Sequence, residues 1–102
     1  MANRHRSYDE VIAKSFENTE YAQCFLLHIV NDEGLSVEEA LRESIKAMGL
    51  QNYASKSNLS IQAVSDFVSK RRKWSSDKIA KQVEKVFKLK VKLTIENPDQ
   101  AA

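Results

Sequence analysis

The stretch from Leu50 to Lys73 constrains the fold most, because two helical patterns flank a segment that suits a tight turn. In the second pattern, apolar residues recur at the spacing of one helical face: Val64, Phe67 and Val68. Between the patterns, Asn58 tolerates the left-handed conformation that ends a helix, and Ser60 can cap the helix that follows. The first helix contains Tyr53, Ala54 and Ser57. The stretch therefore predicts a helix-turn-helix.

The outward side of the second helix carries residues that the core does not need. In a DNA major groove, Gln bonds adenine at two points, Ser bonds several base edges and Asp accepts from cytosine. Four cations follow at Lys70–Lys73. Most such runs are solvated charged loops, but at the end of a recognition helix this one predicts phosphate contacts. The predicted DNA-binding residues are Ser60, Ile61, Gln62, Ser65, Asp66, Ser69, Lys70, Arg71, Arg72 and Lys73.

Two roles are expected within this set. Gln62, with Ser65 close by, is predicted to face base edges, and the cations after the helix are predicted to meet phosphates. Asp66 has two alternatives, because an anion in the groove repels phosphate unless a cytosine amine meets it. It either faces a base edge or pairs with Arg71 or Lys70.

The same segment resembles the helix-turn-helix domain of the phage-repressor-like, or xenobiotic-response-element, family. The family pattern is Ala, three residues, Gly, one residue, Ser, three residues, then Val or Ile followed by Ser. The corresponding positions here are Ala54, Asn58, Ser60, Val64 and Ser65. Asn58 replaces the Gly, and Lys70 stands near the Gly that often follows the recognition helix. The resemblance implies a lambda-repressor-like, all-α bundle of five or six short helices.

Other segments resemble the addiction-module antidote proteins, which are short antitoxins of the HigA type. These segments are Asn18–Ala22, Val37–Glu43 and Ala47–Leu50, and the similarity runs from Glu17 to Glu96. The resemblance implies a transcriptional regulator that represses its own operon and pairs with a RelE-like toxin. The alternatives are a solitary repressor-like regulator and a protein-interaction module that has lost DNA binding.

Composition favours a small helical protein. The chain has 102 residues, 42% of them hydrophobic, with two Gly and one Pro, which suits one mostly helical domain. The single cysteine, Cys24, excludes an internal disulfide and suits a reducing cytoplasm. We see no signal peptide and no run of the roughly 20 apolar residues that span a membrane. The predicted location is cytoplasmic, without membrane contact.

Charge divides the chain into two halves. Residues 1–49 contain five Lys/Arg and nine Asp/Glu, a net charge of −4, whereas residues 50–102 contain eleven and five, a net charge of +6. The basic half coincides with the predicted helix-turn-helix, as expected of a protein that binds a polyanion. We expect the acidic residues 7–49 to bind the basic toxin that the resemblance implies.

Within one domain of residues 1–102, three parts and two tails are predicted. Residues 7–49 form N-terminal helices, 50–73 the helix-turn-helix, and 74–96 the last helix and a C-terminal strand; the tails are 1–6 and 97–102. The predicted N-caps are Ser7, Asn18, Ser36, Ser60, and Ser75 or Ser76. Gly34 and Gly49 are predicted to end helices that begin near Thr19 and Val37.

The predicted strand covers residues 90–96. Its signal is the alternation of Val91, Leu93 and Ile95 with polar residues, a period of two. A lone strand leaves its backbone groups unpaired, so we predict pairing with a two-fold copy and therefore a homodimer on a palindromic DNA operator. Pairing with an N-terminal segment of the same chain is the alternative.

Candidate chemical sites are weak. Cys24 and His28 share a helical face, but they supply only half of a zinc site and have no orienting third group. Trp74 is expected to pack rather than to stack on a base. The position of three glutamates in the first turns of a capped helix explains them better than a catalytic carboxylate pair does: Glu38, Glu39 and Glu43. Four lysines of the last helix are expected to form a solubilising side rather than to contact DNA: Lys78, Lys81, Lys85 and Lys88. No enzyme activity, catalytic residue, cofactor or metal is expected.

Overall fold

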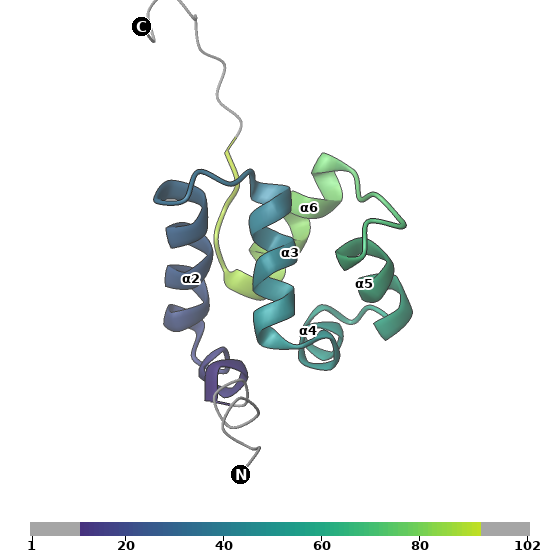
Figure 1. Cartoon of the computed structure of the whole chain (residues 1–102), viewed down its shortest axis with the longest axis horizontal. Helices are drawn as coiled ribbons and strands as arrows, with labels where there is room; N and C mark the ends of the chain where they lie inside the picture. Colours follow the sequence, from purple (N-terminus) through teal and green to yellow (C-terminus); the bar gives the residue numbers. More distant parts are fainter. Residues whose placement is uncertain (1–10, 93–102) are drawn as a thin grey trace, which may run out of the picture.

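The structure, a computed structural model, describes residues 11–92, and these form a bundle of short helices (Figure 1). A short helix covers residues 11–15. The elements that follow are α2 (Thr19–Asn31), α3 (Val37–Met48), α4 (Leu50–Ser57), α5 (Ile61–Val68), α6 (Ser76–Gln82) and the π-helix η1 (Val83–Phe87). α2 and α3 lie side by side and run in opposite directions, while α4, α5 and α6 pack against α3 from its other side (Figure 1). The predicted helical bundle is therefore confirmed for this part of the chain.

Side-chain caps explain where several helices begin. In each, a side-chain oxygen accepts a hydrogen bond from the backbone N–H three residues later. The pairs are Asn18 with Tyr21 (3.2 Å), Ser36 with Glu39 (3.1 Å), Ser60 with Ala63 (3.1 Å) and Ser75 with Lys78 (3.1 Å). Each cap stabilises its helix by about 1 kcal/mol. All these caps were predicted, and at the last helix the residue is Ser75.

Left-handed residues end several helices. Gly49, with a φ of 100°, separates α3 from α4, and Asn58 ends α4 with a φ of 62° and a ψ of 30°. Asn58 therefore has the predicted conformation, and the chain turns over residues 58–60 into α5. Lys70 also has a positive φ, 68°, two residues after α5. Gly takes this conformation without steric strain, whereas Lys does not.

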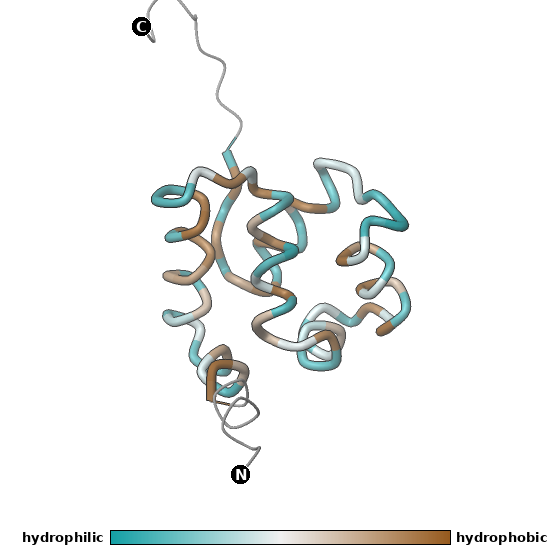
Figure 2. The backbone as a smooth tube through the Cα atoms, in the orientation of Figure 1, coloured by the Kyte–Doolittle hydropathy of each residue, from teal (hydrophilic) through white to brown (hydrophobic). Residues whose placement is uncertain are grey.

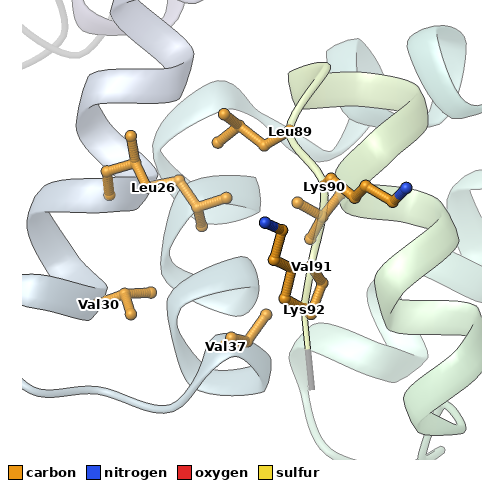
Figure 3. Close-up of a pocket in the computed structure, with 9 residues that line it drawn as sticks. Leu26, Val30, Val37, Leu89, Lys90, Val91 and Lys92 are labelled. Atoms are coloured by element: carbon orange, nitrogen blue, oxygen red, sulfur yellow. The ribbon is translucent and has the colours of Figure 1, made fainter. Parts of the chain in front are cut away.

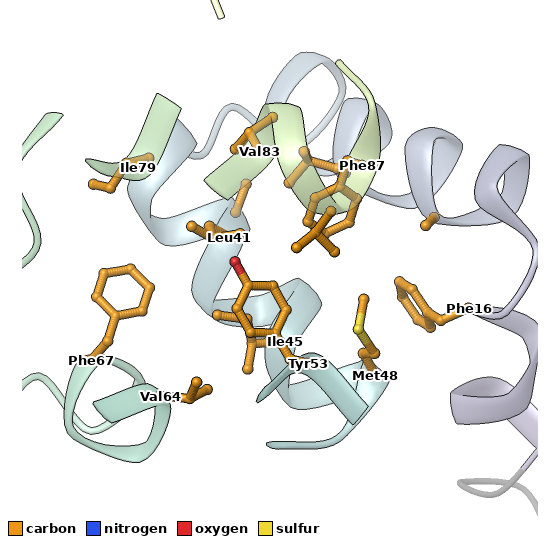
Figure 4. Packing of buried hydrophobic residues seen from close by; sticks show 14 of the residues in the cluster. Phe16, Leu41, Ile45, Met48, Tyr53, Val64, Phe67, Ile79, Val83 and Phe87 are labelled. Atoms are coloured by element: carbon orange, nitrogen blue, oxygen red, sulfur yellow. The ribbon is translucent and has the colours of Figure 1, made fainter. Parts of the chain in front are cut away.

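Hydrophobic and hydrophilic residues alternate along the helices (Figure 2). One cluster of buried apolar residues extends from Phe16 to Phe87 and includes residues of α2 to α6 and η1 (Figure 4). Tyr53 lies within it, and the Tyr53 hydroxyl donates a hydrogen bond to Gln82 Oε1 at 2.7 Å. Burial raises the pKa of Tyr53. Val64 and Phe67 belong to the same cluster, which fixes the buried side of α5 as the sequence predicted.

The C-terminal part differs from the expectation in two ways. The last helix changes at Val83 into the π-helix η1. Over five residues, the spacing of apolar residues cannot distinguish a π-helix from an α-helix. Of the expected strand 90–96, residues 90–92 form no strand, because the surrounding described elements are helices and offer no strand to pair with. Residues 93–96, both tails and the Ser7 cap lie outside the described residues.

No helix within residues 11–92 is both long enough and apolar enough to cross a membrane.

Candidate nucleic-acid interface

α5 buries one side and leaves the other accessible. Val64 and Phe67 are fully buried, and the Ser60 hydroxyl caps the helix start. The remaining residues predicted to bind DNA from this helix and its end are accessible: Ile61, Gln62 and Ser69 are exposed, and Ser65 and Asp66 are half-buried. The helix therefore offers mixed polar and apolar side chains on a surface that the core does not use.

The loop with the four cations turns back onto the end of α5. The left-handed turn at Lys70 brings the backbone N–H groups of Arg71 and Arg72 to the carbonyl oxygen of Asp66, at 2.9 and 3.0 Å. Lys70, Arg71, Arg72 and Lys73 are all exposed. The backbone of Asp66 thus holds the start of this basic loop at the C-terminal end of α5.

The Asp66 carboxylate joins two other predicted site residues. Gln62 Nε2 donates to Asp66 Oδ1 at 2.9 Å, and Arg71 Nε lies 3.3 Å from the same oxygen. In this single chain Asp66 therefore pairs with Arg71, one of the two predicted alternatives. We call Gln62, Asp66 and Arg71 the Asp66 cluster.

Stacked side chains fix both ends of the basic loop. Phe67 precedes the loop and Trp74 follows it, and their rings stack with centroids 3.9 Å apart and planes 5° apart. The Arg42 guanidinium lies 4.5 Å from the centre of the Phe67 ring, and Lys78 Nζ lies 4.8 Å from that of Trp74. Trp74 is buried, so its ring packs, as predicted. The stack limits the movement of the loop relative to α3, α5 and α6.

Arg42 is a structural support for this site that the sequence reasoning missed. Its side chain is 7% exposed, and Nη2 lies 2.7 Å from Glu38 Oε2. Arg42 Nε donates to the Phe67 carbonyl oxygen at 2.9 Å, which also accepts from the backbone N–H of Lys70 at 3.1 Å at the end of α5. The sequence signal is a Glu–Arg pair four residues apart, which usually marks an exposed helix face.

The four cations of the loop have different surroundings. Lys70 and Lys73 line a polar pocket that also contains Glu38, Glu39 and Arg42. Carboxylates at the start of α3 therefore partly offset the charge of these two lysines. Arg72, by contrast, is exposed and forms no ion pair with another residue of the described part.

The lysines of the last helix are largely engaged within the protein. Lys81 Nζ lies 3.2 Å from Asp77 Oδ2, and Lys85 Nζ donates to the Ser57 carbonyl oxygen at 3.1 Å. With Lys78 on Trp74, these contacts favour a packing and solubilising role over direct DNA contact.

The other polar candidates form local contacts. His28 Nδ1 lies 2.7 Å from Asp32 Oδ2, and Nε2 lies 3.5 Å from Glu33 Oε2. Cys24 is exposed, and Lys46 pairs with Glu43 at 3.3 Å. Between residues 11 and 92, no group of three His, Cys, Asp or Glu residues is arranged to hold a metal ion.

An apolar groove lies between α2 and the segment 89–92 (Figure 3). Its lining includes Leu27 and Val91, which are 44% and 37% exposed. Residues 89–92 form no backbone hydrogen bond with another described residue. The backbone N–H and C=O groups of this segment are therefore not paired with the backbone of the described part of the chain.

No protein-family model matches the chain, and no curated protein or solved structure matches it either. Its function is therefore inferred from the residues and their geometry. The capped helix α5 has accessible Gln and Ser side chains, and a basic loop follows it. Such an arrangement can place hydrogen-bonding groups against base edges and cations against the phosphates of a nucleic acid.

Proposed function

We propose that the chain is a sequence-specific DNA-binding transcriptional regulator whose repressor-like helix-turn-helix consists of α4, residues 58–60 and α5. One observation carries the proposal: the accessible side of the capped helix α5 leads directly into four exposed cations. The DNA major groove admits an α-helix, and basic residues at the end of that helix neutralise phosphates. The two kinds of contact that DNA recognition requires thus lie next to each other.

In this proposal the N-terminal turns of α5 enter the major groove. Gln62 reads adenine, Ser65 bonds a neighbouring base edge, and the exposed Ile61 contacts a thymine methyl group. Arg71 and Arg72 contact phosphates and position the helix. Arg72 contributes most directly, because no described carboxylate pairs with it.

The protein acts as a homodimer on a palindromic operator. The apolar groove and the segment 89–92 support this part of the proposal. The C-terminal segment of a second copy can pair with the backbone of residues 89–92 and cover the apolar groove. Leu93 and Ile95 continue the apolar alternation of Val91 in sequence. Two-fold symmetric proteins read two half-sites one helical turn apart or a multiple of it.

The antitoxin role follows from the resemblance and from the charge division. Residues 1–49 carry a net charge of −4 and contribute none of the proposed DNA contacts. They remain available to a small basic toxin of the RelE-like kind while α5 holds the operator. A solitary regulator has the same DNA site without this partner.

Selection from a pool of random duplexes tests DNA binding, together with a gel shift on the DNA upstream of the coding sequence. The proposal expects enrichment of one palindromic sequence and a shift that an unrelated duplex does not compete away. Binding to no duplex, by a folded protein, would refute the DNA-binding proposal and favour the protein-interaction module.

Co-expression with the neighbouring open reading frame tests the antitoxin role separately. Co-purification and rescue of growth are expected if that frame encodes the toxin. Failure of both would refute the antitoxin assignment and leave the DNA-binding proposal standing.

A further inference from the structure

We infer that Asp66 sets the base preference of α5 without contacting DNA, by orienting the Gln62 amide toward adenine and by partly neutralising Arg71. The inference rests on the proposed DNA-binding function and makes Asp66 a positioning residue of that site. Its physical basis is the single carboxylate oxygen Oδ1, which both Gln62 Nε2 and Arg71 Nε approach, at 2.9 and 3.3 Å.

The carboxylate determines which way the Gln62 amide points. An ionised carboxylate only accepts hydrogen bonds, so the amide nitrogen of Gln62, and not its oxygen, must face Asp66. Oε1 and the second N–H of Gln62 then remain available. One acceptor beside one donor is what a Gln needs to bond N6 and N7 of adenine together. A side chain at position 66 that both donates and accepts would allow the amide to turn over.

The surroundings of Asp66 hold its carboxylate in place. Its side chain is 23% exposed, and its carbonyl oxygen receives the N–H groups of Arg71 and Arg72. The Ser69 hydroxyl donates to the same carbonyl oxygen at 3.3 Å. The basic loop therefore holds the backbone at position 66, and Arg71 holds the carboxylate that accepts the hydrogen bond from Gln62.

The negative charge has a second effect, on binding to unrelated DNA. Non-specific affinity depends on the number of phosphates that cations neutralise. A carboxylate 3.3 Å from Arg71 Nε weakens the attraction of that guanidinium for any phosphate, whatever the sequence. Arg71 retains its Nη donors for a phosphate at the correct site. Asp66 thus lowers background binding and preserves the adenine contact, so that the ratio of specific to non-specific affinity rises.

Asp66→Asn is the test substitution, because it keeps the shape and removes both the charge and the acceptor-only chemistry. Asp77→Asn is the matched control: it also removes a helical carboxylate paired with a cation, Lys81, but lies outside the Asp66 cluster. Wild type first selects its preferred duplex from a random pool. The position read by Gln62 is then identified as the one where Gln62→Ala loses its base preference.

Binding is measured by fluorescence anisotropy on three duplexes: the selected one, the same duplex with the adenine pair at that position replaced by a guanine pair, and a scrambled one. Wild type should discriminate between the first two by roughly 5- to 150-fold. Asp66→Asn should lose most of this discrimination and bind the scrambled duplex about two- to fivefold more tightly, as the loss of an exposed ion pair allows. Asp77→Asn should retain the wild-type ratios.

A double variant tests whether Asp66 acts through Gln62. In the Gln62→Ala background, Asp66→Asn should cause no further change in base preference at that position. Unchanged adenine preference in Asp66→Asn, or equal weakening on all three duplexes, would overturn the inference while the proposed function stands. If folded wild type selects no sequence, the proposed function fails first. Thermal unfolding checks each variant, and Asp66→Ser carries the same expectation if Asp66→Asn does not fold.

Discussion

Replacing Arg42 with Met should lower the unfolding free energy by about 2–4 kcal/mol, although Arg42 is a charged residue on an amphipathic helix. Met keeps most of the apolar stem and removes the guanidinium. The hydrogen bond from Nε to the Phe67 carbonyl oxygen, at 2.9 Å, is charge-assisted and contributes about 1.5–3 kcal/mol. The contact with the Phe67 ring at 4.5 Å contributes roughly 0.5–2 kcal/mol more.

Two further terms act in opposite directions. The ion pair of Arg42 with Glu38 is lost, but Glu38 is 29% exposed and regains water. The cost of burying the guanidinium is also removed, which offsets part of the loss. A net change of about 3 kcal/mol in a domain of this size lowers the melting temperature by roughly 10–20 °C.

Urea denaturation followed by circular dichroism measures the change. Lys46→Met is the matched control on the same helix, since Lys46 and Glu43 are 55% and 48% exposed and the change should stay within about 0.5 kcal/mol. A loss below about 1 kcal/mol for Arg42→Met, or equal losses for both variants, would refute the supporting role of Arg42.

Three other predictions address the core, the loop and the dimer. Tyr53→Phe should cost about 1–2 kcal/mol in neutral urea titrations, because Gln82 Oε1 is left unpaired. Since burial raises the pKa of Tyr53 above its ordinary 10.0, wild type should lose stability progressively as pH rises above about 10, and Tyr53→Phe should lack that part of the loss. Lys70→Gly should raise stability by about 0.5–1 kcal/mol in the same assay, because it relieves a positive φ; an unchanged or lower value would contradict this. Truncation after Leu89 should convert the dimer to a monomer in light scattering, and a persistent dimer would place the interface elsewhere.

The sequence predicted those features of the fold that depend on near neighbours. Asn58 and Ser60 act on the backbone within three residues, so the turn before α5 and its cap could be read directly. The buried side of α5 followed from the spacing of Val64 and Phe67. Local chemistry of this kind needs no knowledge of the remaining structure.

Features that depend on tertiary packing were not predictable. Arg42 reaches a carbonyl 25 residues away, and a Glu–Arg pair four residues apart indicates an exposed face rather than a buried one. Gln62 meets Asp66 within α5, four residues apart, but Arg71 reaches the same oxygen only because the chain turns back at the left-handed Lys70, a conformation that Lys seldom adopts. The sequence left the Asp66–Arg71 pair as one of two alternatives and did not indicate that Gln62 shares the same carboxylate oxygen.

The salt dependence of binding, measured for wild type, Gln62→Ala and Arg72→Ala on the selected and the scrambled duplex, tests the proposed DNA interface most directly. Gln62→Ala should weaken binding to the selected duplex by about 1–3 kcal/mol and change the scrambled duplex little. Arg72→Ala should weaken both and lower the slope of log affinity against log salt by about one unit. Equal weakening of both duplexes by Gln62→Ala, or an unchanged slope in Arg72→Ala, would contradict the placement of α5 in the major groove with the basic loop on the phosphates.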